Sequence, residues 1–255
     1  MTETPFSGIR LLTRPGEVMT PRPATAALVE TAAALVGDRR ARVADVGTGS
    51  GAVAVAVAIA APNARVWATD ISSAAVLLAR ANVARHGLGD RVAVSRADLL
   101  DGVPDGLDLV VANLPYLPDH LRGARPELAG EPPQAVFARG DGLGHYRRLL
   151  STSRTALRPD GAVVIQLHRR VLLIRASELG AERSGSLINR ADANGIGSFE
   201  PMAKPPALQD VICVHCGKPF RAEVLAPESE QAGVKCPHCK LFMPLERIEA
   251  SEDAA

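Results

Sequence analysis

Residues 45–51 read Asp45-Val46-Gly47-Thr48-Gly49-Ser50-Gly51, and this stretch decides the fold class. It follows an apolar run over 42–46 that is typical of a short buried strand, and it opens an Ala- and Val-rich run over 51–61 that is typical of a helix. Glycines allow a backbone to approach a ligand closely. The spacing differs from the dinucleotide fingerprint, and no Gly-Lys-Ser or Gly-Lys-Thr follows, which disfavours a phosphate-binding loop. An ordinary tight turn between a strand and a helix stays open as the alternative.

Strands and helices alternate on both sides of this loop. Helices are predicted over 20–37, 72–86 and 146–157, and strands over 65–69, 91–96, 107–112 and 162–167. The alternation predicts an α/β fold, namely a Rossmann-like, mostly parallel sheet with helices on both faces. Residues 1–19 are expected to be irregular, and residues 171–174 to form either a strand or a helical turn.

Acidic residues accompany three successive predicted strands. Asp45 precedes the first glycine by two residues, Asp70 ends the second strand and Asp98 follows the third. At the end of the second strand, the Asp70 carboxylate can accept hydrogen bonds from ribose hydroxyls, and Asp98 can accept one from an adenine amino group. Each acid alone is more often a helix cap or part of a solvated turn. Together with the glycine loop, the three acids resemble the pattern of class I S-adenosylmethionine-dependent methyltransferases.

This resemblance implies S-adenosylmethionine as the cofactor. Open α/β sheets bind their ligands outside the carboxyl ends of the strands, which is where these residues are predicted to lie. The resemblance therefore implies that cofactor contacts come from the glycine loop and the strand ends, namely Asp45, Gly47, Thr48, Gly49, Ser50, Gly51, Asp70, Asp98, Leu99 and Asn113.

The fourth predicted strand runs into Asn113-Leu114-Pro115-Tyr116. An amide nitrogen is a poor nucleophile because its lone pair is delocalised into the carbonyl. The Asn113 side-chain oxygen and the Leu114 carbonyl can accept its two N–H bonds and aim the nitrogen at a methyl carbon, so that orientation replaces a strong base. Pro115 forces Leu114 to be extended, and Tyr116 can pack against the planar group. A plain turn at a strand end is the alternative.

This segment is similar to the Asn-Pro-Pro-Tyr motif of methyltransferases that modify amide or exocyclic amino nitrogens, with Leu114 in place of the first proline. We therefore predict Asn113, Pro115 and Tyr116 as catalytic residues. We predict that substrate is bound by the whole segment, that is Asn113, Leu114, Pro115 and Tyr116.

Further stretches narrow the resemblance to one family. Thr20-Pro21-Arg22-Pro23-Ala24-Thr25 precedes the first core helix, and the later motifs are Glu131-Pro132, Ala135-Val136-Phe137, Gly140-Asp141-Gly142-Leu143 and Tyr146-Arg147. In this order and spacing they resemble the release-factor glutamine methyltransferases, the HemK/PrmC family, over about residues 15–168. The resemblance implies methylation of a glutamine side-chain amide in a peptide-release factor, with Asn113, Pro115 and Tyr116 holding the glutamine.

The chain departs from that family in three places. The family's separate N-terminal helical domain is missing from this sequence. The family's Pro-Arg-Pro-Glu-Thr-Glu motif has Ala24 and Ala26 in place of its two acids. The pattern also ends after the fifth predicted strand, which would leave an unpaired sheet edge of the kind that proteins normally cover. Either residues 169–210 cover this edge, or a partner does, or the domain is damaged.

Four cysteines lie beyond residue 212 as two Cys-x-x-Cys pairs. They are Cys213 and Cys216, followed by Cys236 and Cys239, a spacing that is typical of zinc ribbons. Four thiolates fill a tetrahedral shell and leave no open position, so the predicted zinc is structural rather than catalytic. Two disulfides or a redox dithiol are the alternatives, and a reducing cytosol disfavours the disulfides.

The whole chain has 255 residues, 47% hydrophobic content and a formal net charge of +1, so bulk charge argues neither for nor against a nucleic-acid partner. We expect a methyltransferase domain over 15–168, a linker or atypical end of the sheet over 169–210, a zinc-ribbon-like module over 211–248 and a disordered tail over 249–255. The sequence shows neither a signal peptide nor an apolar run long enough to span a membrane, so a soluble cytoplasmic protein is expected. It does not indicate the oligomeric state.

Three functions compete at this point. The first is N-methylation of a protein glutamine, with a release factor as the partner. The second is methylation of an amino group in a nucleic acid, which ranks lower because the chain lacks a strong basic patch. The third is an interaction protein whose methyltransferase domain is catalytically weak.

Overall fold

The computed structural model describes residues 1–167, 170–179, 208–212, 219–223, 233–235 and 242–244. The chain divides into two units, Met1–Phe199 and Glu200–Ala255, each of which is described by itself. In the described part of the chain, no helix is both long and apolar enough to cross a membrane.

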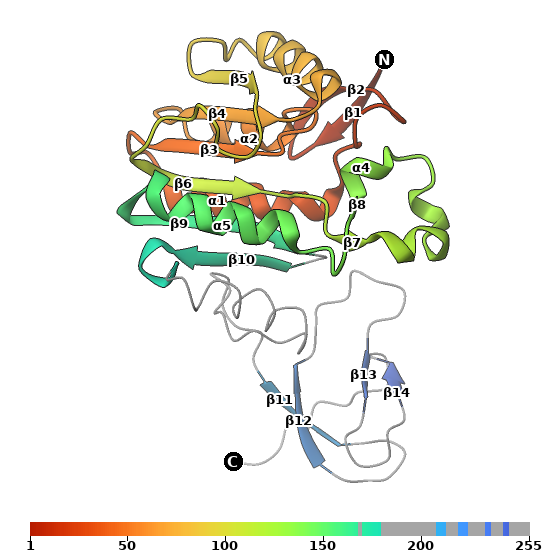
Figure 1. Ribbon diagram of the computed structural model, residues 1–255. Coiled ribbons are helices and arrows are strands. Elements are labelled where there is room, and N and C mark those ends of the chain that lie inside the picture. Colours follow the sequence, from red (N-terminus) through yellow and green to blue (C-terminus); the bar gives the residue numbers. More distant parts are fainter. Residues whose placement is uncertain (168–169, 180–207, 213–218, 224–232, 236–241, 245–255) are drawn as a thin grey trace. The chain divides into compact units, whose positions relative to one another are not determined.

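The first unit is built on a six-stranded sheet with the order β10-β9-β6-β3-β4-β5 (Figure 1). Its strands are β3 (Arg42–Val46), β4 (Arg65–Asp70), β5 (Val92–Arg96), β6 (Leu107–Ala112), β9 (Leu157–Leu167) and β10 (Arg170–Arg175). Neighbours from β9 to β5 pair in parallel, and only β10 is antiparallel. The predicted Rossmann-like, mostly parallel sheet is thus confirmed.

Helices cover both faces of this sheet. They are α1 (Ala26–Val36), α2 (Ala52–Ala60), α3 (Ser73–Arg85) and α5 (Gly144–Ala156), whereas the short α4 (Pro133–Val136) packs beside β8 outside this sheet. The central strand β6 shows how the two cores form: Leu109 and Val111 pack with α1 and α2, whereas Val110 and Ala112 pack with α5. Alternate side chains of a strand point to opposite faces, so a strand that is apolar throughout must be buried on both sides.

Short elements complete the first unit. The 3-10 turns are η1 (Pro23–Thr25), η2 (Asp119–Ala124), η3 (Pro126–Leu128) and η4 (Ala176–Glu178), and the two-residue strands β7 (Leu117–Pro118) and β8 (Phe137–Ala138) pair in parallel. The segment between β6 and α5 is therefore a small insertion that follows the Asn113–Tyr116 loop. The helix predicted from residue 20 begins only at Ala26, after η1.

The expectation of an irregular N-terminus is wrong. Strands β1 (Thr2–Phe6) and β2 (Ile9–Thr13) form an antiparallel hairpin. Its turn residues Ser7 and Gly8 both have positive φ, as the favoured two-residue hairpin turns require. Phe6 and Leu11 are buried in the core that contains α1 and α2. A Ser-Gly pair between two short β-prone runs was the available signal.

The edge of the fifth parallel strand is covered by the chain itself. β10 pairs with β9 in register from Arg170 opposite Leu167 to Arg175 opposite Ala162. Leu172 and Ile174 of β10 are buried. Residues 171–174 therefore form a strand, which was one of the two predictions for them, and they remove the exposed edge at β9.

In the second unit the described residues form two antiparallel hairpins. One pairs β11 (Leu208–Ile212) with β12 (Pro219–Glu223), and the other pairs β13 (Gly233–Lys235) with β14 (Phe242–Pro244). The four cysteines, Cys213, Cys216, Cys236 and Cys239, lie outside the described residues, as does the tail over 249–255. Among the described residues, no cluster of His, Cys, Asp or Glu is arranged to hold a metal ion.

Candidate active site

The glycine loop between β3 and α2 is held by backbone hydrogen bonds to the next strand. The amides of Gly47 and Thr48 both donate to the Thr69 carbonyl, at 2.8 and 2.9 Å. Gly47 has φ of +72°, and a Cβ built on it would lie 2.5 Å from Leu114 Cδ2. The positive φ therefore favours glycine at this position, and a Cβ here would also force the end of the Leu114 side chain to move.

Asp45 lies underneath this loop. Its Oδ2 accepts from the Thr48 hydroxyl at 2.6 Å and from the Ala54 amide in the first turn of α2 at 3.0 Å. The side chain is buried, and this burial raises the pKa of Asp45 to about 6. Asp45 thus ties the loop to the start of the helix that follows it.

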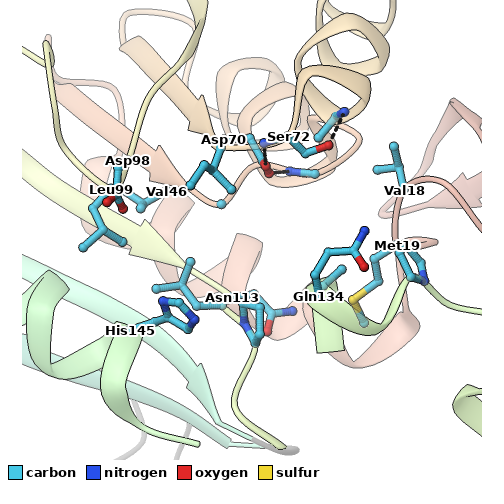
Figure 2. Close-up of a pocket in the computed structure, with 18 of the residues that line it drawn as sticks. Val18, Met19, Val46, Asp70, Ser72, Asp98, Leu99, Asn113, Gln134 and His145 are labelled. Carbon is cyan, nitrogen blue, oxygen red and sulfur yellow. Dashed lines mark hydrogen bonds between the residues drawn. The ribbon is translucent and has the colours of Figure 1, made fainter. Parts of the chain in front are cut away.

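Asp70 forms the second anchor of the loop and ends β4. Its Oδ2 accepts from the Gly49 amide and its Oδ1 from the Ser72 amide, both at 2.9 Å. Burial raises the pKa of Asp70 above its ordinary value. Figure 2 shows Asp70 and Ser72 on one side of a cavity at the carboxyl ends of the strands.

This first cavity collects most of the predicted cofactor residues. Asp98 and Leu99 lie at one end in Figure 2, Val18 and Met19 lie at the other, and Asn113 points in from the end of β6. Gly47, Gly49 and Asp70 also line it. Asp45, Thr48 and Ser50 instead border a smaller adjoining cavity behind the loop. Gly51 is the N-cap residue of α2, and a Cβ on it would lie 3.1 Å from Cα and Cβ of Ala79.

Asp98 has a partner that the sequence did not reveal. Its Oδ2 accepts from Arg148 Nη2 at 2.7 Å, and this arginine of α5 also lines the first cavity. Both side chains are substantially exposed, so the ion pair contributes little stability. Leu99, the next residue, is buried with φ of +52°, and the Thr69 hydroxyl donates to its carbonyl at 2.7 Å.

The Asn113 side chain is held from the start of α1. Its Nδ2 donates to the Thr25 hydroxyl at 3.2 Å, across 88 residues of sequence. The residues that the structure describes form no other hydrogen bond to this side chain. Its Oδ1 is therefore left as an acceptor for a ligand.

Leu114 is held from α5 by Tyr146, which is fully buried. The Leu114 amide donates to the Tyr146 hydroxyl at 2.9 Å. The hydroxyl lies 2.6 Å from the Gln166 carbonyl and 3.1 Å from the Leu114 carbonyl, so its single proton favours the nearer Gln166. Burial raises the pKa of Tyr146, which keeps the phenol protonated. The Leu114 peptide is thereby fixed in place.

Gly142 supports the same loop from behind. Its φ is +86°, and a Cβ on it would collide with the Tyr116 carbonyl. The next residues lead into α5, and Asp141 forms an ion pair with Arg147 that lowers the pKa of Asp141 to about 2. The Gly140–Leu143 motif thus has a packing role beside the loop.

A second cavity adjoins the first at the Asn113–Tyr116 loop. Asn113, Leu114 and Pro115 line both cavities, whereas Tyr116 lines only the second of the two. The remaining lining of the second comes largely from η1, η3 and α4, including Thr25 and Leu128. The loop therefore forms the boundary between the two cavities.

Four features together define a Rossmann-like methyltransferase fold. They are the strand order of the sheet, the glycine loop after β3, the carboxylate at the end of β4 and the Asn-Leu-Pro-Tyr loop after β6. Residues 21–123 match the Methyltransferase small domain family.

Named relatives make the comparison more specific. The release factor glutamine methyltransferase of Deinococcus radiodurans is 40% identical over 179 residues, which is 69% of this chain and 63% of that protein. That of Gloeobacter violaceus is 40% identical over 154 residues, or 59% and 54%. The ribosomal protein uL3 glutamine methyltransferase of Bradyrhizobium diazoefficiens is 39% identical over 110 residues, or 42% and 34%. The chain thus spans less than two thirds of the length of these relatives.

Proposed function

We propose that this chain is an S-adenosylmethionine-dependent N-methyltransferase whose acceptor is a glutamine side-chain amide of a protein, with a peptide chain release factor as the partner. The observation that carries the proposal is the position of Asn113, which lines both cavities and whose Oδ1 accepts no hydrogen bond from the residues that the structure describes. The similarity to release factor glutamine methyltransferases supports the choice of acceptor.

The first cavity fits the cofactor by the chemistry of its lining. The Asp70 carboxylate suits ribose hydroxyls, and Ile71 and Leu99 offer apolar surface beside Asp98 for an adenine ring. The glycine loop allows the backbone to approach the methionine end closely. When bound there, S-adenosylmethionine supplies an electrophilic methyl group.

Not every predicted cofactor residue needs to touch the cofactor. Thr48 and Ser50 are buried, and Asp45 has one carboxylate oxygen occupied by two donors of the protein. We assign these residues, together with Gly51, the role of shaping the loop. Direct contacts are assigned to Gly47, Gly49, Asp70, Asp98, Leu99 and Asn113, all of which line the first cavity.

The acceptor amide is oriented by the Asn113–Tyr116 loop. Asn113 Oδ1 and the Leu114 carbonyl accept the two N–H bonds of the glutamine amide and turn its nitrogen toward the first cavity. Pro115 keeps Leu114 extended, and Tyr116 lines the second cavity where the rest of the glutamine enters. A nitrogen–carbon bond forms as the sulfur–carbon bond breaks, and the nitrogen then gives one proton to water. These residues accelerate the step by orientation, without a strong base.

Methyl transfer to candidate acceptors tests this proposal. The purified chain would be incubated with S-adenosylmethionine carrying a labelled methyl group and with a release factor, uL3 or RNA, and products would be mapped by mass spectrometry. We expect label on a glutamine of the release factor and a loss of at least about 10²-fold in Asn113→Ala. Label on uL3 would keep the chemistry and change the partner. Label only on RNA, or cofactor binding without any transfer, would favour the two competing functions.

We also propose that Cys213, Cys216, Cys236 and Cys239 hold a structural zinc in a module over 211–248. The support is their spacing, together with the strands that flank each pair in sequence. The first pair falls between β11 and β12 and the second between β13 and β14. Two short hairpins that each carry a Cys-x-x-Cys pair are typical of zinc ribbons. One zinc per chain by metal analysis, lost when Cys213 and Cys236 are both changed to Ser, is the expected result.

A further inference from the structure

We infer that Thr25 is a positioning residue that holds the Asn113 side chain in its working orientation, an inference that rests on the function proposed above. Thr25 belongs to the Thr20–Thr25 motif, and no role for it was predicted from the sequence. It is buried, and it lines the second cavity. Its hydroxyl forms the single hydrogen bond that the described residues make to the Asn113 amide.

The local structure shows that this hydroxyl does not cap its own helix. Thr25 occupies the N-cap position of α1, where threonine commonly accepts a hydrogen bond from an amide of the first turn. Its φ and ψ of −79° and −9° are helical rather than extended, and no such side-chain bond forms. The backbone amide of Thr25 donates to the Arg22 carbonyl and closes the η1 turn, so it is the backbone rather than the hydroxyl that takes part in local structure. The hydroxyl is therefore available to Asn113.

The contact matters because an asparagine side chain at a strand end can rotate. Asn113 points into the first cavity from the end of β6 (Figure 2). With Nδ2 bonded to Thr25, the plane of the amide is fixed and Oδ1 stays on the side of the cavities. Without the hydroxyl, the amide samples orientations in which Oδ1 no longer faces the acceptor nitrogen. A misplacement of about 1 Å at a reacting group can cost about 10²-fold in rate.

Two substitutions separate the hydroxyl from the packing of the side chain. Thr25→Val keeps the branched shape and removes the hydroxyl, whereas Thr25→Ser keeps the hydroxyl. Methyl transfer would be measured as kcat and KM, with melting temperature as the check on folding. We expect kcat to fall by about 10- to 10²-fold in Thr25→Val and to remain near wild type in Thr25→Ser. In an Asn113→Ala background, Thr25→Val should have no further effect, since coupled residues are not additive.

A second measurement needs no methyl acceptor, so it tests the role of Thr25 even if the proposed function is wrong. The side-chain amide of Asn113 gives a nitrogen–proton signal that can be assigned by its absence in Asn113→Ala. We expect this signal to shift in Thr25→Val and to return in Thr25→Ser. An unchanged signal in Thr25→Val would overturn the inference. So would a rate that falls equally in both Thr25 variants, or one that falls again in the Asn113→Ala background. A wild-type chain that methylates no glutamine would instead count against the proposed function alone.

Discussion

On the proposed cofactor side of the site, the glycine loop is held by Thr69, Asp45 and Asp70, which lie within about two dozen residues of it in sequence. On the proposed acceptor side, Asn113 and Leu114 are held by Thr25 and Tyr146, which lie 88 and 32 residues away. The cofactor loop is mostly fixed by backbone amides and carboxylates close to it in the chain. The acceptor loop depends on side chains that the fold brings to it.

This difference predicts which kinds of substitution each side tolerates. A loop that is fixed mainly by nearby carboxylates and by glycine conformation is disturbed by changes at those few positions. A loop that is fixed by distant side chains can be disturbed from α1 or α5 while the cofactor site stays intact. Cofactor affinity and methyl-transfer rate should therefore respond to different residues.

The largest effect is expected at Asp70. Asp70→Ala removes the acceptor of the Gly49 and Ser72 amides and the carboxylate proposed to bind ribose. Hydrogen bonds to charged groups contribute about 1.5–3 kcal/mol each, so the Kd for S-adenosylmethionine should rise by roughly 10²-fold. Calorimetry measures this directly. Asp70→Asn, which keeps one acceptor oxygen, should lose less, and an unchanged Kd in Asp70→Ala would contradict the assignment of Asp70 to the cofactor site.

The next effect should appear on the acceptor side, at Tyr146. Tyr146→Phe leaves the buried Leu114 amide and the Gln166 carbonyl without this hydroxyl. We expect the free energy of unfolding to fall by about 1–3 kcal/mol. We also expect kcat to fall by roughly 10-fold, because Leu114 is less well placed, with the Kd for S-adenosylmethionine unchanged. Denaturant titration, kinetics and calorimetry measure the three quantities.

Ser153 offers a matched control on the same helix. It is also fully buried, and its hydroxyl has no hydrogen-bond partner among the residues that the structure describes. Ser153→Ala should therefore change neither stability nor kcat. Equal losses in Tyr146→Phe and Ser153→Ala would show that α5 packing, rather than the hydroxyl contact with Leu114, is responsible.

The anchors of the proposed cofactor side are easier to recognise in the sequence than those of the proposed acceptor side, for the same reason. Gly47, Gly49 and Asp70 lie in strand-end patterns that can be read locally, and the structure places them around one cavity. The function of the Tyr146 hydroxyl, by contrast, depends on the packing of α5 against β6 and β9, which no local pattern encodes. The pairing of Arg148 with Asp98 was missed because charged residues on a predicted helix are usually solvated.

The fold shows the same division. The strand over 107–112 was predicted with its observed bounds, because a fully apolar run has few alternatives. The N-terminal hairpin was missed, although it is tied to the core by Asn82 of α3. The Asn82 side chain accepts from the Leu12 amide and donates to the carbonyls of Leu12 and Ser50. An asparagine inside an apolar helix gives no sign of which distant backbone it will meet.

Gly47 lies where the glycine loop approaches Leu114 of the acceptor loop. Substitutions at Gly47 and Gly49 therefore distinguish effects on the cofactor side from effects on the acceptor side. Gly47→Ala and Gly49→Ala both place alanine at positive φ, which costs about 1–2 kcal/mol. Only at Gly47 does the new Cβ meet Leu114, since a Cβ at Gly49 has open space around it. Both variants should lose several-fold in S-adenosylmethionine affinity. Only Gly47→Ala should also lower kcat at saturating cofactor. Equal kcat values in Gly47→Ala and Gly49→Ala would show that the contact between the glycine loop and Leu114 does not affect methyl transfer.

The smallest expected effect is on the pH dependence of folding stability. It distinguishes Asp45, which can be charged, from Thr25 and Tyr146, the neutral side chains that hold the acceptor loop. The folded-state pKa of Asp45 is raised to about 6, above the value of 3.8 for a free aspartate. Between these values the folded chain holds a proton that the unfolded chain has lost, so this group makes stability fall as pH rises and has no further effect above pH 6. The slope is bounded by one proton, about 1.4 kcal/mol per pH unit. Asp45→Asn should lack this contribution, so the stability of wild type relative to Asp45→Asn should decline from about pH 4 to pH 6 in denaturant titrations. Tyr146→Phe should run parallel to wild type over the same range, because the phenol stays protonated throughout. A parallel line for Asp45→Asn as well would mean that the pKa of this carboxyl is the same in the folded and the unfolded chain, so that its two hydrogen bonds offset its burial.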